Sequence, residues 1–321
     1  MYGSATASGV IATSIRTYGW IAWADVPIAP MTSIRIGGVA PWVIWPRTVQ
    51  EAVHVLQTLH THEIPWRILG GGSNVLVPDE QRLPWVIVRL DRLRAMEIAP
   101  DGDTAIVRAG AGLRASVLVR RLARLGWSGL EFAAGIPGQI GGLVWMNAGA
   151  FTRAVADVLC AVAVWFPGQS DVVWHTVRPA EFGYRRSPFQ STQGVILGAA
   201  FRVHRRSPSA IQSELVRMQR HRQSTQPLRS HSAGCAFKNP SQQSPAGYLL
   251  EHAGMKGFRI GRAQFSPRHA NFIINLGGAT WQDVVRLIEM GQQRVWEQFR
   301  IWLEPEIAIW HVHPVDSASH A

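Results

Sequence analysis

Two glycine-rich segments most constrain how this chain can fold. The first, GGGSN at 70–74, separates two short apolar runs at 66–69 and 85–88 that are typical of strands. The second, at 129–151, contains clustered glycines and shows no sustained helical or strand period. Successive glycines let backbone N–H groups converge on one ligand, so both segments predict loops shaped around a bound molecule. The alternatives are a tight structural turn for the first segment and an ordinary glycine-rich crossing of two chains for the second.

The hydrophobic pattern around these loops mixes helices and strands. Apolar residues at helical spacing predict helices at about 48–62, 209–222 and 246–254, and a longer one that Thr280 caps, with Asp283 three residues on. Runs rich in apolar residues predict strands at 104–112, 158–166, 171–177 and 195–203. Because helices and strands are interleaved, we expect an α+β fold. A total of 321 residues is enough for about two domains.

A domain boundary is predicted near residue 205. Charged residues, Ser and Pro interrupt the apolar pattern in RRSPS at 205–209. The first 24 residues show no clear period, and the last eleven are typical of a frayed tail. Neither end is expected to carry chemistry.

The net charge of +11, from 32 Lys and Arg against 21 Asp and Glu, raises the question of nucleic-acid binding. Only Lys238 and Lys256 are lysines, and the arginines are spread along the chain rather than gathered in long runs. We favour a solvated basic surface and expect no nucleic-acid partner. An Arg-rich nucleic-acid-binding protein is the rival from another class. It would bind DNA or RNA in a salt-sensitive way, and its purified preparation would be colourless because such a protein needs no coloured cofactor.

Cysteine usage and the apolar runs indicate the cellular compartment. Cys160 and Cys235 are too few for a disulfide framework and are not spaced as a metal site. No run reaches 18 uninterrupted apolar residues, and the N-terminus lacks the pattern of an export signal. We expect a cytoplasmic protein with no membrane span and no bound metal.

Three further segments hold side chains that could carry chemistry. YRRS at 184–187, at the end of an apparent helix, offers guanidinium groups suited to a carboxylate or phosphate, although a surface pair is the simpler interpretation. Cys235 lies close to Lys238 in the sequence, and its thiol can donate a proton, although a buried inert cysteine is the commoner case. LEPE at 303–306 carries two Glu, of which one is expected to face solvent.

These segments together closely resemble the UDP-N-acetylenolpyruvoylglucosamine reductase family. The resemblance covers about Val26 to Trp310 and rests on six ordered motifs. They are GGGSN (70–74), GLEFAAGIPGQIGG with MNAGAF (129–151), YRRS (184–187), SAGCAFKNP (232–240), AGYLLEHAGMKGFRIGRAQFSPRHANFIIN (246–275) and LEPE (303–306). TSIRIGG at 32–38 is also similar to the family's entry to its flavin domain.

The resemblance implies an FAD-binding domain of the vanillyl-alcohol-oxidase type, in two α+β subdomains, followed by a C-terminal α+β substrate domain. The expected segments are an extension at 1–25, the FAD-binding domain at 26–204, the substrate domain at 205–310 and a tail at 311–321. The chain is similar to the shorter of the family's two forms, because only some twenty residues separate Arg185 from the boundary.

The resemblance also implies noncovalent FAD, with NADPH as the hydride-donating cosubstrate. The FAD pyrophosphate is expected against Gly70, Gly71, Gly72, Ser73 and Asn74. The rest of the expected cofactor site is Gly135, Ile136, Pro137, Gly138, Gly141, Gly142 and Asn147. NADPH would reduce the flavin and leave before the enolpyruvyl ether of a UDP-sugar binds.

The implied chemistry forms UDP-N-acetylmuramate, a peptidoglycan precursor. Flavin N5 would deliver hydride to the terminal enolpyruvyl carbon, and the neighbouring carbon would receive a proton. Arg185 and Glu306 are implied to stabilise the enolic intermediate. Tyr184, Lys238 and Asn239 are implied near the sugar or phosphates. No obligate protein partner is inferred.

Two positions depart from the family pattern. Cys235 stands where the family commonly has a Ser as proton donor, and Thr225 stands where it often has a basic residue. A thiol is a stronger acid than a hydroxyl, so we expect Cys235 to fill the donor role and to add sensitivity to alkylation. Another FAD-dependent oxidoreductase of the same fold is the alternative, and the motifs of the second domain argue against it.

Overall fold

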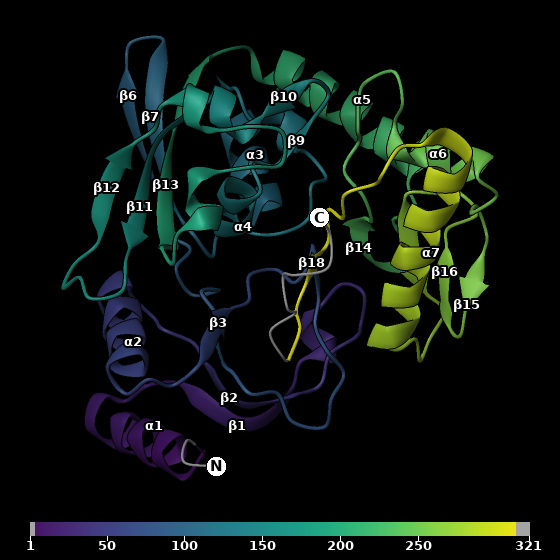
Figure 1. Ribbon diagram of the computed structural model, residues 1–321. Coiled ribbons are helices and arrows are strands. Elements are labelled where there is room, and N and C mark those ends of the chain that lie inside the picture. Colours follow the sequence, from purple (N-terminus) through teal and green to yellow (C-terminus); the bar gives the residue numbers. More distant parts are fainter. Residues whose placement is uncertain (1–3, 313–321) are drawn as a thin grey trace. The chain divides into compact units, whose positions relative to one another are not determined.

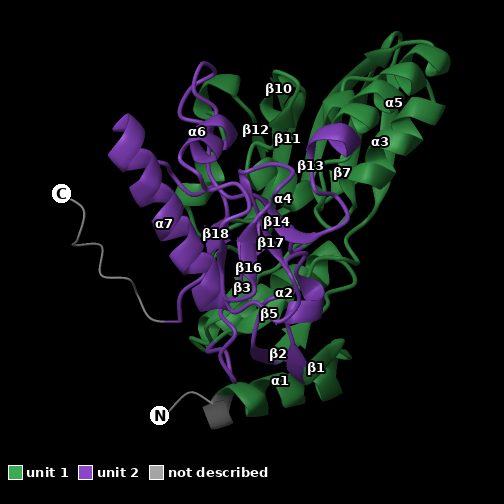
Figure 2. Cartoon of the chain, turned by 90° about the vertical axis from the view of Figure 1, so that its right-hand side faces the viewer, with its two compact units in different colours: residues 1–24, 42–71, 85–221 green, residues 25–41, 72–84, 222–321 purple. Residues whose placement is uncertain are grey.

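The computed structural model describes residues 4–312 (Figure 1). The chain forms two compact units, coloured separately in Figure 2. Unit 1 comprises residues 1–24, 42–71 and 85–221, and unit 2 comprises residues 25–41, 72–84 and 222–321. The chain therefore passes from unit 1 to unit 2 inside the first glycine-rich loop, between Gly71 and Gly72. Most of the tail expected at 311–321 lies outside the described residues.

A four-stranded sheet has the order β1-β2-β5-β3, in which β5 pairs in parallel with both β2 and β3. Its strands are β1 (Ala22–Pro27), β2 (Val39–Ile44), β3 (Trp66–Ile68) and β5 (Val86–Val88). Helix α2 (Val49–Thr61) begins where the Thr48 hydroxyl accepts a hydrogen bond of 3.1 Å from the Glu51 N–H. Its buried face includes Leu56 and Leu59. The helix and strands expected at 48–88 are confirmed.

Helix α1 (Ser4–Tyr18) was not indicated by the sequence pattern. Ile11 is fully buried, and Val10 and Ile15 are partly buried against the same apolar cluster as α2. The helix is rich in Ala, Ser and Thr, so its few large apolar residues mark the buried face too weakly to give a clear period.

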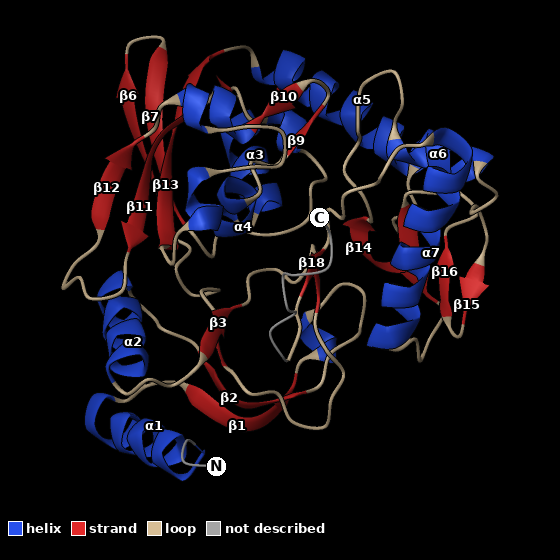
Figure 3. Cartoon of the chain, viewed as in Figure 1, coloured by secondary structure: helices blue, strands red, loops and turns tan. Residues whose placement is uncertain are grey.

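The larger sheet of unit 1 is antiparallel and has the order β12-β11-β13-β7-β6, with β8 also paired to β13. Its strands are β6 (Met96–Asp101), β7 (Thr104–Gly110), β8 (Trp127–Ser128), β11 (Leu159–Trp165), β12 (Val173–Thr176) and β13 (Val195–Arg205). Helices α3 (Ala115–Arg124) and α4 (Ile140–Trp145) pack on this sheet (Figure 3). Val107, Phe132, Val162 and Phe201 lie in the shared core. The strands expected at 104–112, 158–166, 171–177 and 195–203 are confirmed.

Shorter elements complete unit 1. They are the pair β9 (Gly149–Ala150) and β10 (Arg153–Ala154), and 3-10 turns at Glu131–Ala133, Val155–Asp157, Pro179–Glu181 and Pro188–Ser191. Helix α5 (Pro208–Thr225) begins just after the boundary expected near residue 205, whereas the compact units change between His221 and Arg222.

Unit 2 holds a four-stranded antiparallel sheet of order β14-β17-β16-β15 and a parallel pair of β4 with β18. The sheet consists of β14 (His231–Cys235), β15 (Arg259–Ile260), β16 (Ala263–Phe265) and β17 (Phe272–Asn275). The pair consists of β4 (Val75–Leu76) and β18 (Ala308–Ile309). A 3-10 turn at Ala29–Met31 and helix α6 (Ala246–His252) also belong to this unit.

Helix α7 (Trp281–Phe299) starts with the predicted capping box. The Thr280 hydroxyl accepts from the Asp283 N–H at 3.0 Å, and the Asp283 carboxylate accepts from the Thr280 N–H at 3.1 Å. Val284, Ile288 and Val295 are buried, whereas Trp281, Val285 and Phe299 are only partly buried. Among the described helices, none is long and apolar enough to cross a membrane.

Candidate functional site

The first glycine loop and the start of the second glycine-rich segment line one pocket of unit 1, with a volume of about 300 Å³. Its lining residues are Gly71, Arg89, Asp91, Arg114, Ser116, Gly135, Ile136, Pro137, Gly138 and Gln139. Five of these residues were expected to bind the cofactor. A larger hollow of about 510 Å³ beside the end of α2 contains none of the expected site residues.

The two segments approach each other so closely that glycine is required. A Cβ atom at Gly71 would lie 2.9 Å from the Cα of Gly138, and a Cβ at Gly70 would lie 3.4 Å from Oε1 of Gln139. In unit 2, Gly72 has φ of +63°, and a Cβ there would lie 2.2 Å from the Met31 carbonyl oxygen. The loops are therefore built from bare backbone, as the glycine content predicted.

An ion pair that the sequence analysis did not single out lies in this pocket. The Arg89 guanidinium binds the Asp91 carboxylate through two hydrogen bonds, of 2.6 and 2.8 Å, and the Gln139 amide donates to the same carboxylate at 2.5 Å. Burial alone would raise the pKa of Asp91, but the Arg89 charge and hydrogen bonds and the Gln139 amide together lower it. The position of Asp91 shortly after the apolar run at 85–88 was the available signal.

The pocket suits an anionic group. Within the described part of the chain, Nη1 of Arg89 is buried without a hydrogen-bond partner, although the rest of that guanidinium is bound to Asp91. Arg114 adds a second positive charge to the lining. A buried donor without a partner is costly, and an acceptor such as a phosphate oxygen would satisfy it. The bare glycine backbone and these donors together fit the pyrophosphate of FAD.

Helix α4 follows the pocket and contains Gly141 and Gly142. The Gly141 N–H donates to the Ala111 carbonyl at 2.9 Å, and a Cβ at Gly141 would lie 3.2 Å from Ala111 Cβ. By contrast, a Cβ at Gly142 would meet no protein atom within 4 Å. Packing within the protein therefore explains a glycine at 141 but not at 142.

Asn147 is a buried residue just after α4 whose side chain joins two other segments through hydrogen bonds. It is 5% exposed and has a φ of +41°. Its amide nitrogen donates to the Gly183 carbonyl at 2.8 Å, and its amide oxygen accepts from the Ala156 N–H at 3.0 Å. The side chain therefore fixes the segment that leads into Tyr184.

YRRS does not end a helix, so that expectation was wrong. Gly183 and Arg186 exchange two backbone hydrogen bonds, of 3.0 and 3.1 Å, and close a tight turn whose central residues are Tyr184 and Arg185. The element before this turn is the short 3-10 turn at Pro179–Glu181. The turn that begins at Gly183 follows it too closely for a longer helix with an apolar face to form. The Tyr184 ring is 54% exposed, and the Arg185 guanidinium carbon lies 5.0 Å from its centroid.

In unit 2, Cys235 and Glu306 lie on paired segments. The Glu306 N–H donates to the Ala236 carbonyl at 2.8 Å, and the Lys238 N–H donates to the Glu304 carbonyl at 2.9 Å. Pro305, which lacks an N–H, sits between these bonds opposite Phe237. The strand pairing therefore brings the residue next to Cys235 against Glu306.

Lys238 and Asn239 have partners within unit 2. The Lys238 ammonium forms an ion pair with Glu304, whose side chain is 69% exposed. The expectation that one of the two Glu faces solvent is therefore confirmed for Glu304, whereas Glu306 is half-buried. The Asn239 side-chain oxygen accepts from the Ala246 N–H at 3.0 Å at the start of α6.

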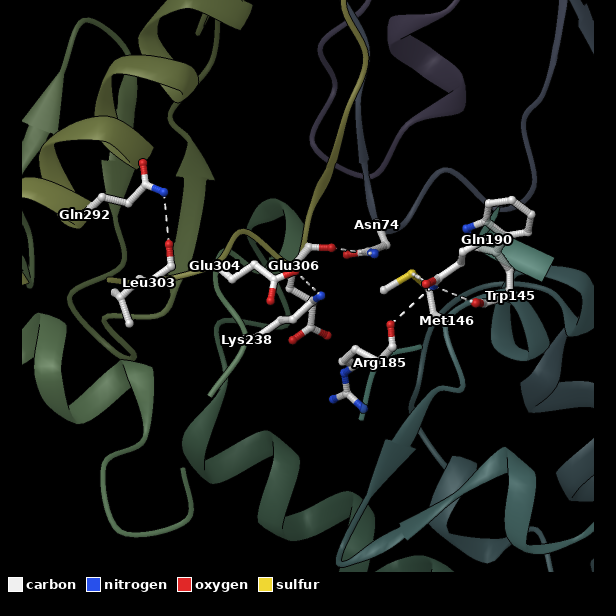
Figure 4. Close-up of polar contacts among 10 residues, drawn as sticks. All are labelled: Asn74, Trp145, Met146, Arg185, Gln190, Lys238, Gln292, Leu303, Glu304 and Glu306. Atoms are coloured by element: carbon white, nitrogen blue, oxygen red, sulfur yellow. Dashed lines mark hydrogen bonds and ion pairs between the residues drawn. The ribbon is translucent and has the colours of Figure 1, made fainter. Parts of the chain in front are cut away.

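Asn74, at the end of the first glycine loop, is bound to the Glu306 segment. Its side-chain amide donates to the Glu306 carbonyl at 3.0 Å (Figure 4), and its own carbonyl accepts from the Ala308 N–H at 3.1 Å. Ser73 precedes it in the same unit. Thus Gly72, Ser73 and Asn74 belong with Cys235 and Glu306, whereas Gly70 and Gly71 belong with the pocket of unit 1. Over residues 4–312 no group of three or more His, Cys, Asp or Glu side chains could hold a metal ion.

Comparison with known families first defines the class of protein. Residues 40–174 match the family model described as an FAD binding domain, which includes the pocket of unit 1. The chain is therefore an FAD-binding flavoprotein, as expected. Residues 226–310 match the model of the UDP-N-acetylenolpyruvoylglucosamine reductase C-terminal domain.

Individual relatives extend this similarity over most of the chain. A UDP-N-acetylenolpyruvoylglucosamine reductase of Synechococcus sp. (strain JA-3-3Ab) is 42% identical over 287 residues, which cover 89% of this chain and 90% of the relative. The reductase of Bacillus velezensis is 38% identical and covers 88% and 92%, respectively. The crystal structure of the Thermus caldophilus reductase covers 91% of this chain and 99% of its own, with a TM-score of 0.73 and 35% identity. The chain belongs to the UDP-N-acetylenolpyruvoylglucosamine reductase family, and the expected α+β fold with an FAD-binding domain is confirmed.

Proposed function

We propose that this chain reduces the enolpyruvyl group of UDP-N-acetyl-3-O-(1-carboxyvinyl)glucosamine to UDP-N-acetylmuramate, with FAD as cofactor and NADPH as cosubstrate. The observation that carries the proposal is the pairing of the Cys235 segment with the Glu306 segment through the hydrogen bond from Glu306 to Ala236. An acid and a carboxylate on two hydrogen-bonded segments suit a reaction in which one carbon must be protonated while charge builds on a carboxylate.

The cofactor would be held by backbone at the glycine segments and by the charged lining of the pocket. The glycines of the segments 70–74 and 135–138 let the backbone approach the cofactor closely, while Arg89 and Arg114 offer positive charge. We assign Gly141, Gly142 and Asn147 to the same site, Asn147 through the segment that it clamps. FAD held there would supply hydride chemistry, passing on to the terminal carbon of the enolpyruvyl group the hydride that NADPH provides.

Three side chains of the chain complete the proposed chemistry. The Arg185 guanidinium would bind the substrate carboxylate, where negative charge grows as the hydride arrives. The Cys235 thiol would give its proton to the carbon next to that carboxylate, leaving a thiolate that regains a proton from solvent. Glu306 would stabilise the enolic form of the substrate.

Substrate binding is assigned to Tyr184, Lys238 and Asn239. The exposed Tyr184 ring offers a stacking surface next to Arg185. Lys238 offers a positive charge that suits a phosphate, with Glu304 as its partner in the substrate-free chain. The Asn239 side chain is an amide, a group suited to hydrogen bonds with sugar hydroxyls, and its oxygen accepts from the Ala246 N–H at the start of α6.

We place the reaction in the cytoplasm and infer no obligate protein partner. Cys160 and Cys235 do not form a disulfide with each other, which supports a reducing compartment. Every partner that the proposed reaction requires is a small anionic molecule.

The proposal is tested by following flavin absorbance after NADPH reduction without oxygen. Addition of the enolpyruvyl UDP-sugar is expected to restore the oxidised spectrum, whereas UDP-N-acetylglucosamine, which lacks the enolpyruvyl group, is expected to leave it reduced. A flavin that NADPH reduces and neither sugar reoxidises would favour another oxidoreductase of the same fold. A chain that cannot be loaded with FAD would contradict the proposal entirely.

A further inference from the structure

The backbone of Arg185 adopts a conformation that its residue type disfavours. Its φ is +55°, in the left-handed region that arginine enters only at an energetic cost. Such a conformation persists where the surrounding structure holds it, and it is concentrated at functional sites. The contacts that hold the turn therefore bear on where the Arg185 side chain points.

Gln190, five residues further on in the 3-10 turn Pro188–Ser191, contacts Arg185 directly. Its amide nitrogen donates to the Arg185 carbonyl at 3.2 Å and to the Trp145 carbonyl at 2.8 Å, and it lies 3.7 Å from the Met146 sulfur (Figure 4). One amide group thus ties the peptide after Arg185 to the end of helix α4.

Other side chains secure the same turn at different points. The Ser187 hydroxyl also donates to the Trp145 carbonyl, at 2.8 Å, and Asn147 donates to the carbonyl of Gly183. The last carbonyls of a helix have no partner within the helix, so Ser187 and Gln190 together satisfy the one at Trp145. The start of helix α4 therefore carries the two glycines that are assigned to the cofactor site. The end of the same helix is hydrogen-bonded to the turn that contains Arg185.

We infer that Gln190 is a positioning residue for the reaction, because it fixes the peptide of Arg185 and with it the direction in which the guanidinium leaves the backbone. Gln190 itself touches neither substrate nor cofactor in this role. The inference rests on the proposed function, in which Arg185 binds the substrate carboxylate. A displacement of about 1 Å in such a group can cost about a hundredfold in rate.

The variant Gln190→Met tests the inference, because methionine keeps the length of the side chain and loses both N–H donors. Bound FAD and the rate of flavin reduction by NADPH should stay within about twofold of wild type, whereas the rate of flavin reoxidation by the enolpyruvyl UDP-sugar should fall by about tenfold to a hundredfold. Ser191→Ala is the matched control, because it removes a hydroxyl from the same turn that bonds to Pro188, and it should leave both rates unchanged.

A double-mutant cycle separates positioning from a general structural effect. If Gln190 acts through Arg185, Gln190→Met should slow reoxidation by less than about twofold when Arg185→Ala is already present, since coupled residues are not additive. Full additivity of the two losses would overturn the inference. A reoxidation rate for Gln190→Met equal to that of wild type would also overturn it.

A second variant guards against loss of the fold. Gln190→Glu keeps the shape of the side chain and presents oxygen where Gln190 presents N–H groups, so it should slow reoxidation at least as much as Gln190→Met. Loss of bound FAD in both variants would overturn the inference, because Gln190 would then be holding the fold rather than Arg185. Failure of the wild-type chain to be reoxidised by the sugar is a separate result, which would contradict the proposed function instead.

Discussion

The side-chain amide of Asn74 donates a hydrogen bond of 3.0 Å to the backbone carbonyl of Glu306. Asn74 is the last residue of the first glycine loop, and Glu306 carries the carboxylate proposed for catalysis. The same loop residue also accepts from the N–H of Ala308, so it holds the segment from Glu306 to Ala308 at two points. A residue expected only for the cofactor thus also holds the segment that carries the proposed catalytic carboxylate.

Asn74→Ala should impair turnover more than stability. Removing the amide should lower the free energy of unfolding by about 1 kcal/mol and slow turnover by about tenfold as the Glu306 segment loosens. Gln292→Ala is the matched control, because the Gln292 amide donates at 2.9 Å to the Leu303 carbonyl, away from Glu306. It should cost similar stability with less than about a twofold loss of turnover. Urea unfolding measures the stability of both variants, and turnover is measured on the FAD-loaded proteins. Equal losses of turnover in Asn74→Ala and Gln292→Ala would argue against the role of Asn74.

The proposed proton donor can be tested by substitution at Cys235. Cys235→Ala should slow flavin reoxidation by the substrate by about 10²-fold to 10⁴-fold, the usual contribution of a general acid. Cys235→Ser should retain most activity, because a hydroxyl can occupy the same position. Alkylation in a Cys160→Ser background should have the effect of Cys235→Ala. Unchanged reoxidation after complete alkylation would exclude Cys235 as the donor.

Two glycines proposed for the cofactor site should respond differently to an added methyl group. Gly71→Ala should destabilise the FAD-free chain by about 1–3 kcal/mol, because its Cβ would lie 2.9 Å from Gly138 Cα. Gly142→Ala meets open space in helix α4 and should stabilise the FAD-free chain by up to about 1 kcal/mol. Thermal unfolding and FAD titration measure both effects. Both variants should bind FAD more weakly, and unchanged affinity in Gly142→Ala would remove Gly142 from the site.

Asp91 should make stability depend on pH in the acid range. The pKa of Asp91 is lowered in the folded chain because Arg89 and Gln139 outweigh the effect of burial, whereas an unfolded aspartate has a pKa of about 3.9. The stabilisation is therefore present above about pH 4 to 5 and is lost as the pH falls through the lowered pKa. Urea midpoints should show that Asp91→Asn is less stable than wild type at neutral pH and that the difference shrinks in acid. Asp103→Asn, at an exposed turn, should show no such convergence, and a constant difference for Asp91→Asn would contradict the account.

Local signals in the sequence predicted much of the fold. Thr280 and Asp283 predicted the start of α7 because helix capping depends on residues that are neighbours in the sequence. The glycines at 71 and 138 predicted shaped loops because only bare backbone allows that approach. Helix α1 was missed because its buried face is short and weakly apolar.

Long-range contacts could not be predicted in the same way. The ion pair of Arg89 with Asp91 is local, but its place in a pocket with Gln139 depends on how the second glycine segment folds back. The turn at Arg185 is closed locally by Gly183 and Arg186, but its attachment through Gln190 to the end of α4 has no local signal in the sequence. The hydrogen bond from Asn74 to Glu306 joins residues that are distant in the chain, and no local sequence pattern predicts it.

The most direct measurement is mass spectrometry of the product formed from NADPH and the enolpyruvyl UDP-sugar in heavy water, with NADPH consumption followed in parallel. The account predicts UDP-N-acetylmuramate in an amount equal to the NADPH consumed, with deuterium from solvent at the carbon next to the carboxylate. NADPH consumption that does not depend on the sugar, or a sugar recovered with its enolpyruvyl group intact, would contradict it.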